Sequence, residues 1–147
     1  MAVSKLVLNT RDLTDVFFDE SRLMGIMAPL KDYQFCWQLN SVLGMDFRNN
    51  YELEIELIRK NRKYFFSVYS YNEPTGSLCH YIYKNQFDGE YLLPEFKHLD
   101  YLWLLKGDTI NAEVMQQLNT SIRLINGVQL VLELATHKIV NKENLVF

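Results

Sequence analysis

The sequence predicts an α+β domain in which two amphipathic helices cover one face of a curved, mainly antiparallel sheet. Three observations predict this class. Two segments have apolar residues at helical spacing, the middle of the chain alternates with period two, and turn-forming residues separate these segments. Strict alternation is typical of an antiparallel sheet with one wet face, whereas the strands of a parallel sheet are continuously apolar.

The composition predicts one folded domain over residues 1–147. Hydrophobic residues make up 48% of the chain, which has nine Tyr, nine Phe and two Trp but only six Gly and three Pro. Disordered chains are poor in aromatic residues, because they cannot bury enough apolar surface to offset the entropy of ordering. No Pro-, Gly- or Ser-rich linker and no internal repeat divides the chain.

The first part of the chain predicts two strands and a helix. Apolar runs of strand length occupy residues 4–8 and 23–28, and Pro29 ends the second run. From 30 to 43 the spacing becomes helical, and Gly44 follows as a residue that commonly ends a helix. The apolar side of this predicted helix consists of Cys36, Leu39 and Leu43, with Phe35 and Val42 on its flank.

The middle of the chain, residues 51–84, predicts a three-stranded meander. Its strands are expected at 51–57, 64–71 and 78–84. In the first strand apolar residues alternate with acidic ones, so that one face is buried and the other carries Glu52, Glu54 and Glu56. The other two strands are rich in aromatic and β-favouring residues, and the stretch 72–76 supplies the turn between them.

The last part of the chain predicts extended segments, a second helix and a closing strand. Residues 91–93 and 99–105 are expected to be extended, with a break at Pro94. Asp108 or Thr109 is the expected N-cap of the second helix. Its apolar stripe is Val114, Leu118, Ile122 and Ile125, it ends near Asn126 and Gly127, and the closing strand spans 128–134.

The charge balance predicts that nucleic acid is not a partner. Lys and Arg number 15 against 18 Asp and Glu, which gives a formal net charge of −3. Nucleic-acid binding depends instead on an excess of basic side chains that neutralise phosphates. We interpret the single basic run as a solvated hairpin loop between two strands; it consists of Arg59, Lys60, Arg62 and Lys63.

The sequence predicts no metal site, no cofactor and no membrane span. Cys36 and Cys79 lie within apolar patterns and are expected to be buried thiols in a reducing compartment. The three histidines lack metal-ligand spacing, and no Gly-rich phosphate loop occurs. No apolar stretch reaches the ~18 residues of a membrane span, and the N-terminus lacks a secretory core. The expected location is the cytoplasm.

The segment 92–101 resembles the signature of the IPExxxVDY family of small bacterial proteins. Four positions match residue for residue: Pro94, Glu95, Asp100 and Tyr101. Leu93 and Leu99 stand where the signature has Ile and Val. The similarity extends to Gly25-Ile26, Leu39-Asn40 and residues 142–147. The function of this family is unknown, so the resemblance implies one architecture over most of the chain and no reaction.

Two interpretations apply to the corner formed by this segment. Pro94 favours either one helical turn over 94–98 or an extended chain, and in both cases Glu95 and Asp100 lie at its two ends. In the structural interpretation these carboxylates accept hydrogen bonds from backbone amides or an Arg, while the Tyr101 ring packs into the core. In the functional interpretation they form the polar end of a ligand pocket together with His98 and Tyr101.

Asn40 is a further candidate, because Asn in the middle of a helix suggests a specific hydrogen bond. The bond is expected to be structural and directed to the sheet, with ligand contact as the alternative.

The sequence therefore favours a non-enzymatic interaction or structural domain that self-associates or binds a protein partner. No nucleophile with an activating partner is recognisable, so no catalytic residue is assigned. The alternative hypothesis is a small-molecule-binding domain or an enzyme, with a pocket between a helix and the sheet. That pocket would be lined by strand tyrosines (Tyr69, Tyr71, Tyr81 or Tyr83), with Glu95 and Asp100 at one end.

Overall fold

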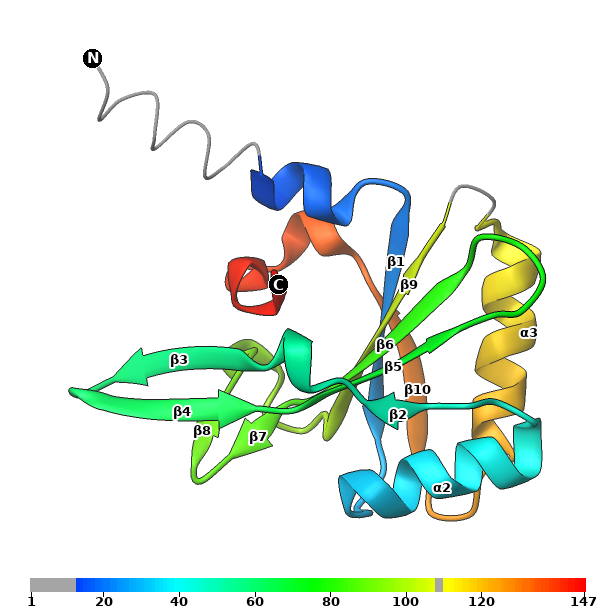
Figure 1. The fold of residues 1–147 in the computed structure, drawn as a ribbon, viewed down its shortest axis with the longest axis horizontal. Helices are drawn as coiled ribbons and strands as arrows, with labels where there is room; N and C mark the ends of the chain where they lie inside the picture. Colours follow the sequence, from blue (N-terminus) through cyan, green and yellow to red (C-terminus); the bar gives the residue numbers. More distant parts are fainter. Residues whose placement is uncertain (1–12, 108–109) are drawn as a thin grey trace.

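A six-stranded antiparallel sheet organises the structure, a computed structural model that describes residues 13–107 and 110–147 (Figure 1). The strands lie in the order β10-β1-β9-β6-β5-β2. Their bounds are β1 (Ser21–Met27), β2 (Arg48–Asn49), β5 (Val68–Asn72), β6 (Cys79–Lys84), β9 (Tyr101–Lys106) and β10 (Leu130–Leu134). All five neighbouring pairs are antiparallel, which confirms the predicted fold class.

Two helices cover one face of this sheet, α2 (Asp32–Leu43) and α3 (Ala112–Arg123) (Figure 1). Gly44 ends α2 in the left-handed conformation, with φ of 69°. The side-chain oxygen of Asn111 accepts a hydrogen bond from the Val114 amide at 2.9 Å and caps the start of α3. Both predicted helices are confirmed, whereas the predicted caps Asp108 and Thr109 lie outside the described residues.

Alternate side chains of β9 separate two apolar cores. Tyr101, Trp103 and Leu105 belong to the core beneath α2 and α3, together with buried residues of both helices. Leu102 and Leu104 belong to a second core on the opposite face of the sheet. All five side chains are at most 1% exposed. The central strand is therefore buried on both faces, which explains why its sequence is continuously apolar.

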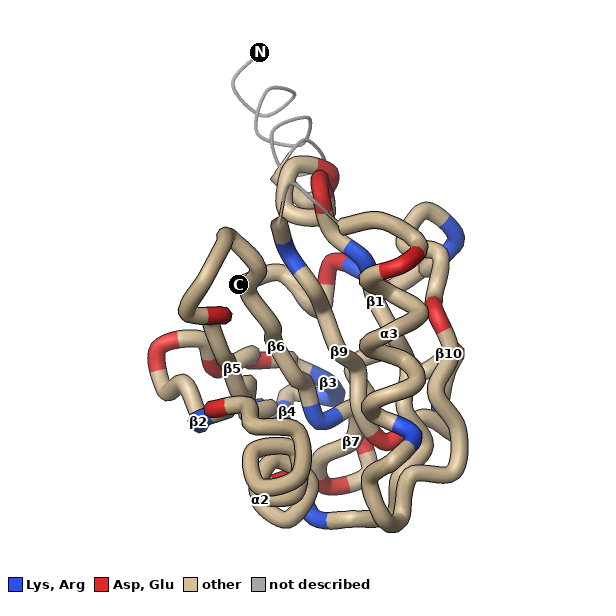
Figure 2. The backbone as a smooth tube through the Cα atoms, turned by 90° about the vertical axis from the view of Figure 1, so that its right-hand side faces the viewer, with Lys and Arg blue, Asp and Glu red and all other residues tan. Residues whose placement is uncertain are grey.

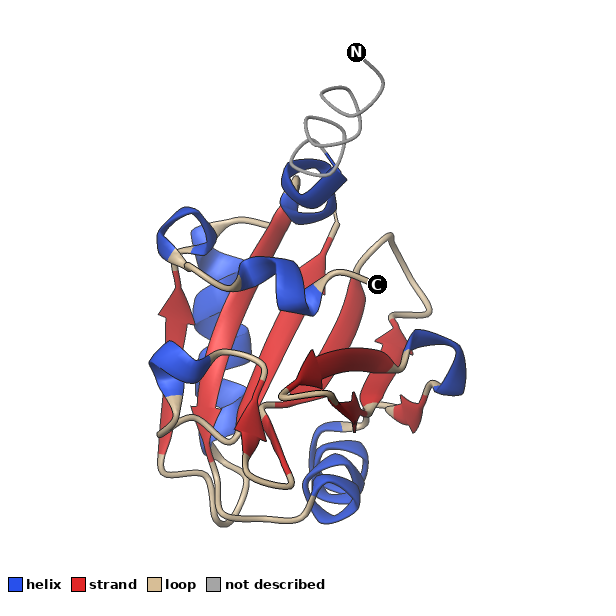
Figure 3. Cartoon of the chain, turned by 90° about the vertical axis from the view of Figure 1, so that its left-hand side faces the viewer, coloured by secondary structure: helices blue, strands red, loops and turns tan. Residues whose placement is uncertain are grey.

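A separate hairpin and the C-terminal segment cover the second face (Figure 3). The hairpin consists of β3 (Ile55–Arg59) and β4 (Arg62–Phe66), and its buried side chains are Ile55, Leu57, Tyr64 and Phe66. The C-terminal segment forms the 3-10 turns Thr136–Lys138 and Lys142–Leu145, which contribute Leu145 to the same core. A small hairpin of β7 (Gln86–Phe87) and β8 (Glu90–Tyr91) contacts β4.

The prediction of one meander over 51–84 is wrong. Tyr51–Leu53 form a 3-10 turn, because the Asn50 side chain accepts a hydrogen bond from the Glu52 amide at 3.1 Å and caps this turn. The strand begins at Ile55, so Glu56 alone of the three predicted glutamates lies in it.

The predicted strand 64–71 is divided at Ser67 into β4 and β5, which belong to different sheets. β4 pairs with β3, while β5 pairs with β2 and β6. Lys60 and Asn61 link β3 to β4 with φ of 52° and 62°, the geometry of a tight two-residue hairpin turn. Of the basic run, only Lys60 lies in this turn, whereas Arg59, Arg62 and Lys63 lie in the two strands that the turn connects. The predicted loop is therefore the tip of a hairpin and is shorter than the sequence predicts.

Three smaller predictions need correction or lie outside the structure. Cys36 is a buried free thiol as expected, but the free thiol Cys79 is only half-buried, because it is the first residue of β6 and follows a surface turn. Val42, expected on the flank of the apolar side of α2, is 58% exposed. The predicted strand at 4–8 lies outside the described residues. Among the residues that the structure describes, no helix is long and apolar enough to cross a membrane.

Candidate functional site

Asn85 holds together the corner that contains the predicted site residues. Its side-chain nitrogen donates to the carbonyls of Phe96 and Leu99, each at 2.9 Å, and its oxygen accepts from the Leu93 amide at 2.9 Å. The residue is fully buried, with 0% exposure. Pro94 begins a short 3-10 turn, Pro94–Phe96, within the segment that Asn85 holds. Of the two predicted conformations, a helical turn and an extended chain, the structure thus has the helical turn.

Glu95 projects from this turn and connects it to the C-terminal segment. Its carboxylate accepts hydrogen bonds from the amides of Val140 and Asn141, at 3.0 and 3.1 Å, and from the Asn141 side chain at 3.0 Å. Partial burial acts to raise the pKa of this carboxyl, but the hydrogen bonds from Asn141 and Val140 outweigh it and hold the pKa below its usual value. Glu95 thus ties η2, the turn Pro94–Phe96, to the cover of the second face.

Asp100 and Tyr101 connect the start of β9 to the loop that leads into α2. The Asp100 carboxylate accepts a hydrogen bond from the Ala28 amide at 2.7 Å, and burial raises its pKa despite this bond. The Tyr101 hydroxyl donates to the Leu30 carbonyl, and the Tyr101 ring stacks on Phe35 with centroids 4.7 Å apart. These contacts are those of the structural interpretation.

The five predicted ligand residues do not gather around one cavity. His98 is exposed beside Phe96, and Asn40 makes two hydrogen bonds, at 2.8 and 3.0 Å, with the backbone of Phe47 in the loop before β2. Asp100 and Tyr101 share a small pocket of about 150 Å³, which Glu95, His98 and Asn40 do not line. A ligand-binding role of these residues stays a prediction.

A larger cavity lies between the helices and the sheet, on the side where the alternative hypothesis expects one. It has a volume of about 350 Å³, and we call it the interhelical cavity. Its apolar walls are Leu43, Met45, Leu78, Leu105, Val114 and Leu118, and its polar groups are Tyr71, Glu73, His80, Gln117 and Ser121. Of the four expected strand tyrosines, only Tyr71 lines it, and Glu95 and Asp100 are not among its lining residues.

His80 connects a wall of this cavity to the core. The Trp103 indole N–H donates to His80 Nδ1 at 3.0 Å, so Nδ1 is an acceptor and the ring proton resides on Nε2. Nε2 lies 2.8 Å from Glu73 Oε2 and donates to it. Burial lowers the pKa of His80, although the hydrogen bond and the charge of Glu73 act in the opposite direction. The imidazole is therefore neutral near pH 7 and leaves the Glu73 carboxylate uncompensated.

Aromatic rings enclose this hydrogen-bonded chain of Trp103, His80 and Glu73. The Tyr71 ring stacks on His80 with centroids 5.3 Å apart and an interplanar angle of 24°. Phe47 meets the rings of both His80 and Trp103 edge to face. Part of this site could be predicted from the sequence. A hairpin with the predicted turn at 72–76 places Tyr71 opposite His80.

The outer side of α2 is a second candidate, as an interaction surface. Tyr33 and Trp37 are 57% and 68% exposed, and they form an open depression of about 610 Å³ with Leu30, Gln34 and Gln38. We call these five residues the α2 aromatic face. Asp32 is the single charged residue within α2, and Figure 2 shows the helix almost free of charged positions.

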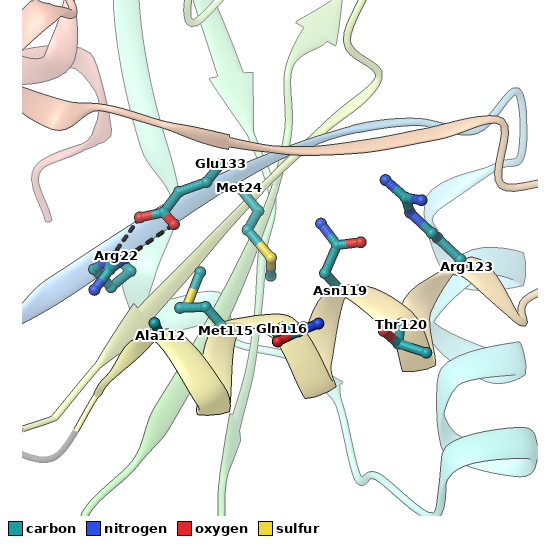
Figure 4. A pocket seen from close by; sticks show the side chains of 9 residues that line it. All are labelled: Arg22, Met24, Ala112, Met115, Gln116, Asn119, Thr120, Arg123 and Glu133. Carbon is teal, nitrogen blue, oxygen red and sulfur yellow. Dashed lines mark hydrogen bonds and ion pairs between the residues drawn. The ribbon is translucent and has the colours of Figure 1, made fainter.

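A groove between α3 and the edge strand β10 is a third candidate, with a volume of about 410 Å³ (Figure 4). Arg22 forms an ion pair with Glu133 across one end, and its Nη2 donates to Oε1 at 3.0 Å. Asn119 and Arg123 both direct side-chain donors to the Val131 carbonyl. The charged pair of this groove is thus internally compensated, and the two α3 side chains bond to the backbone of β10, where they cover part of the sheet edge.

Comparison with models of protein families, with curated proteins and with solved structures found no match. The resemblance to the IPExxxVDY family therefore stays a prediction. Among residues 13–107 and 110–147, no group of three His, Cys, Asp or Glu side chains is arranged to hold a metal ion.

Proposed function

We propose that this chain is a non-enzymatic interaction domain that self-associates through the α2 aromatic face. The observation that carries the proposal is the exposure of Trp37, at 68%, on a helix whose outer side has no charge. Solvated helices normally carry charged and polar residues on their outer face. Exposed Trp and Tyr together on such a face are typical of the buried centre of a protein interface.

A second copy of the chain is the partner that this surface favours. Closed dimers use the same patch on both subunits, so the patch must be compatible with itself. The chain has a formal net charge of −3, which disfavours contacts between copies at acidic surfaces. The α2 aromatic face avoids this repulsion, because all five of its residues are uncharged.

The free thiols and the sequence resemblance support two further parts of the proposal. Cys36 and Cys79 are unpaired, which is typical of a reducing compartment and supports a cytoplasmic location. The motif at 92–101 supports membership of the IPExxxVDY family of bacterial proteins.

Sedimentation velocity of the intact chain and of Trp37→Glu tests the self-association. The unmodified chain is expected to sediment as a dimer at tens of micromolar, and Trp37→Glu as a monomer, because the substitution places a charge in the centre of the interface. The matched control is Ile58→Glu, which changes a 58% exposed apolar residue on the β3–β4 hairpin, opposite Lys63. It should remain dimeric. A monomeric unmodified chain, or a dimer that Trp37→Glu leaves intact, contradicts the proposal.

A further inference from the structure

We propose that the interhelical cavity binds a small organic ammonium ion that carries an apolar group, with the carboxylate of Glu73 as the partner of the ammonium. This site is separate from the α2 aromatic face, and the proposal does not depend on self-association. Glu73 is not among the site residues predicted from the sequence. The predicted pocket between a helix and the sheet shares Tyr71 with this cavity, but its polar end was expected at Glu95 and Asp100, which do not line the cavity.

The charge of the cavity determines the sign of its ligand. Glu73 is the single lining residue that carries a charge, since His80 is neutral and the remaining lining residues are apolar or uncharged. The nearby carboxylate of Asp46 contributes a further negative potential at Tyr71, and Arg48 offsets it at an exposed ion pair of 3.2 Å. A carboxylate that is partly removed from water attracts a cation more strongly than a fully solvated one does. Here the side chain of Glu73 is 33% exposed and it accepts its hydrogen bond from a neutral imidazole.

The hydrogen-bonded chain behind Glu73 fixes the carboxylate in place. Trp103 can only donate, so it keeps His80 Nδ1 unprotonated and directs the Nε2 proton to Glu73. Protonation of His80 would place two N–H groups face to face at Nδ1. The imidazole therefore orients the carboxylate without neutralising it, as a residue that positions a binding group must do.

The walls of the cavity determine the size and polarity of the rest of the ligand. A volume of about 350 Å³ is at the lower end of small-molecule sites, which suits a ligand with one ring or a short alkyl chain. Leu43, Met45 and Val114 offer an apolar wall for this part. The Tyr71 ring also lines the cavity, and aromatic rings attract ammonium groups.

Three probes of similar shape and different charge test the proposal on the intact chain. They are 2-phenylethylammonium, the neutral 2-phenylethanol and the anion phenylacetate. The chain contains two Trp residues, so in the variant Trp37→Phe the remaining Trp103 reports on the cavity through its fluorescence. The ammonium probe is expected to change this fluorescence with a dissociation constant in the millimolar range, as befits a fragment of its size. The neutral and anionic probes should bind at least about ten-fold more weakly.

The variant Glu73→Gln removes the charge and keeps an oxygen that accepts from His80. This substitution is expected to weaken binding of the ammonium probe by about ten-fold or more. Binding of 2-phenylethanol should stay nearly unchanged. The control Glu52→Gln removes an exposed carboxylate elsewhere and should bind the ammonium probe like the parent protein. Equal responses to the three probes, or no response to any of them up to tens of millimolar, overturn the proposal. Since the probe series needs no change at Glu73, this outcome can be read even if Glu73→Gln fails to fold.

Discussion

Asn85 carries no charge and no reactive group, yet its buried amide bonds to three backbone groups of the segment 93–99, the corner that contains Pro94 and Glu95. The carbonyls of Phe96 and Leu99 and the amide of Leu93 all use it as their partner. A polar group that is buried with every hydrogen bond satisfied stabilises a unique local conformation. Asn85 is thus the residue on which the turn Pro94–Phe96 depends.

The substitution Asn85→Ala is expected to lower the free energy of unfolding by roughly 3–5 kcal/mol, because it leaves buried donors and acceptors without partners. Urea unfolding followed by circular dichroism measures this change. The control Asn126→Ala alters an exposed Asn and should change the free energy of unfolding by less than about 0.5 kcal/mol. Similar small effects of both substitutions would show that the corner does not depend on Asn85.

His80 gives the protein a dependence of stability on pH. Its pKa in the folded state lies below the value of 6.5 that applies to the unfolded chain. Below pH 6.5 the unfolded chain therefore binds a proton that the folded protein does not, and the free energy of unfolding falls as the pH decreases. The contribution of the neutral His80 to the free energy of unfolding is fully present above pH 6.5. Between pH 6.5 and the lower pKa of the folded state, this free energy falls by up to about 1 kcal/mol per pH unit.

Urea unfolding at a series of pH values between neutral and mildly acidic conditions measures this slope. The variant His80→Gln is expected to be less stable at every pH. Its free energy of unfolding should fall less steeply below pH 6.5, because the variant has no imidazole to protonate. Asp100, whose pKa burial raises, contributes in the opposite direction and is common to both proteins. Identical slopes for the two proteins would mean that His80 is not held neutral in the folded state.

The helices were the elements most accessible to prediction, because each carries an apolar stripe and a clear end. The segment 30–43 contains α2, and Gly44 ends the helix as expected. The strands were harder, because local hydrogen bonds compete with the alternating pattern. Asn50 caps a 3-10 turn over Tyr51–Leu53 where the alternation alone predicts a strand.

The candidate sites were less accessible, because their partners come from segments that the fold brings together. Trp103 reaches His80 only because β6 and β9 are paired, and Glu95 meets Asn141 across 46 residues of sequence. The residues of the motif could be identified individually, whereas their partners could not. The periodicity of a strand gives its buried face but not its neighbour in the sheet.

Gly25 shows how closely β1 approaches the motif corner. A Cβ atom at this position would lie 2.2 Å from Leu99 Cδ1, and Leu99 is 1% exposed. The substitution Gly25→Ala is therefore expected to lower the free energy of unfolding by roughly 1–3 kcal/mol through overpacking.

A double-mutant cycle with Leu99→Ala tests the cause. Leu99→Ala alone is expected to cost roughly 2–5 kcal/mol because it leaves a cavity, but it also makes room at Gly25. In that background Gly25→Ala should cost less, with a coupling of more than about 0.5 kcal/mol in urea unfolding. Strictly additive costs would show that the cost of Gly25→Ala does not come from contact with Leu99.

At the scale of the whole molecule, the aromatic composition reflects a sheet that is buried on both faces. Tyr69 and Tyr71 pack toward the helices, whereas Tyr81 and Tyr83 pack toward the second core. The rings of Tyr81 and Tyr83 meet Phe147, so the C-terminal residue belongs to the cover of that face. With both faces covered, the large rings that stay exposed on α2 are not needed for the core.

The exposure of Trp37 allows self-association through the α2 aromatic face to be measured at this residue itself. Trp103 is 0% exposed, so quenching of Trp fluorescence by iodide reports on Trp37. At tens of micromolar we expect Trp37 to be shielded from iodide and to emit at shorter wavelength. Dilution to the monomer should restore quenching and shift the emission to longer wavelength. Full quenching of Trp37 at the concentration where the chain sediments as a dimer would show that the dimer does not form through the α2 aromatic face.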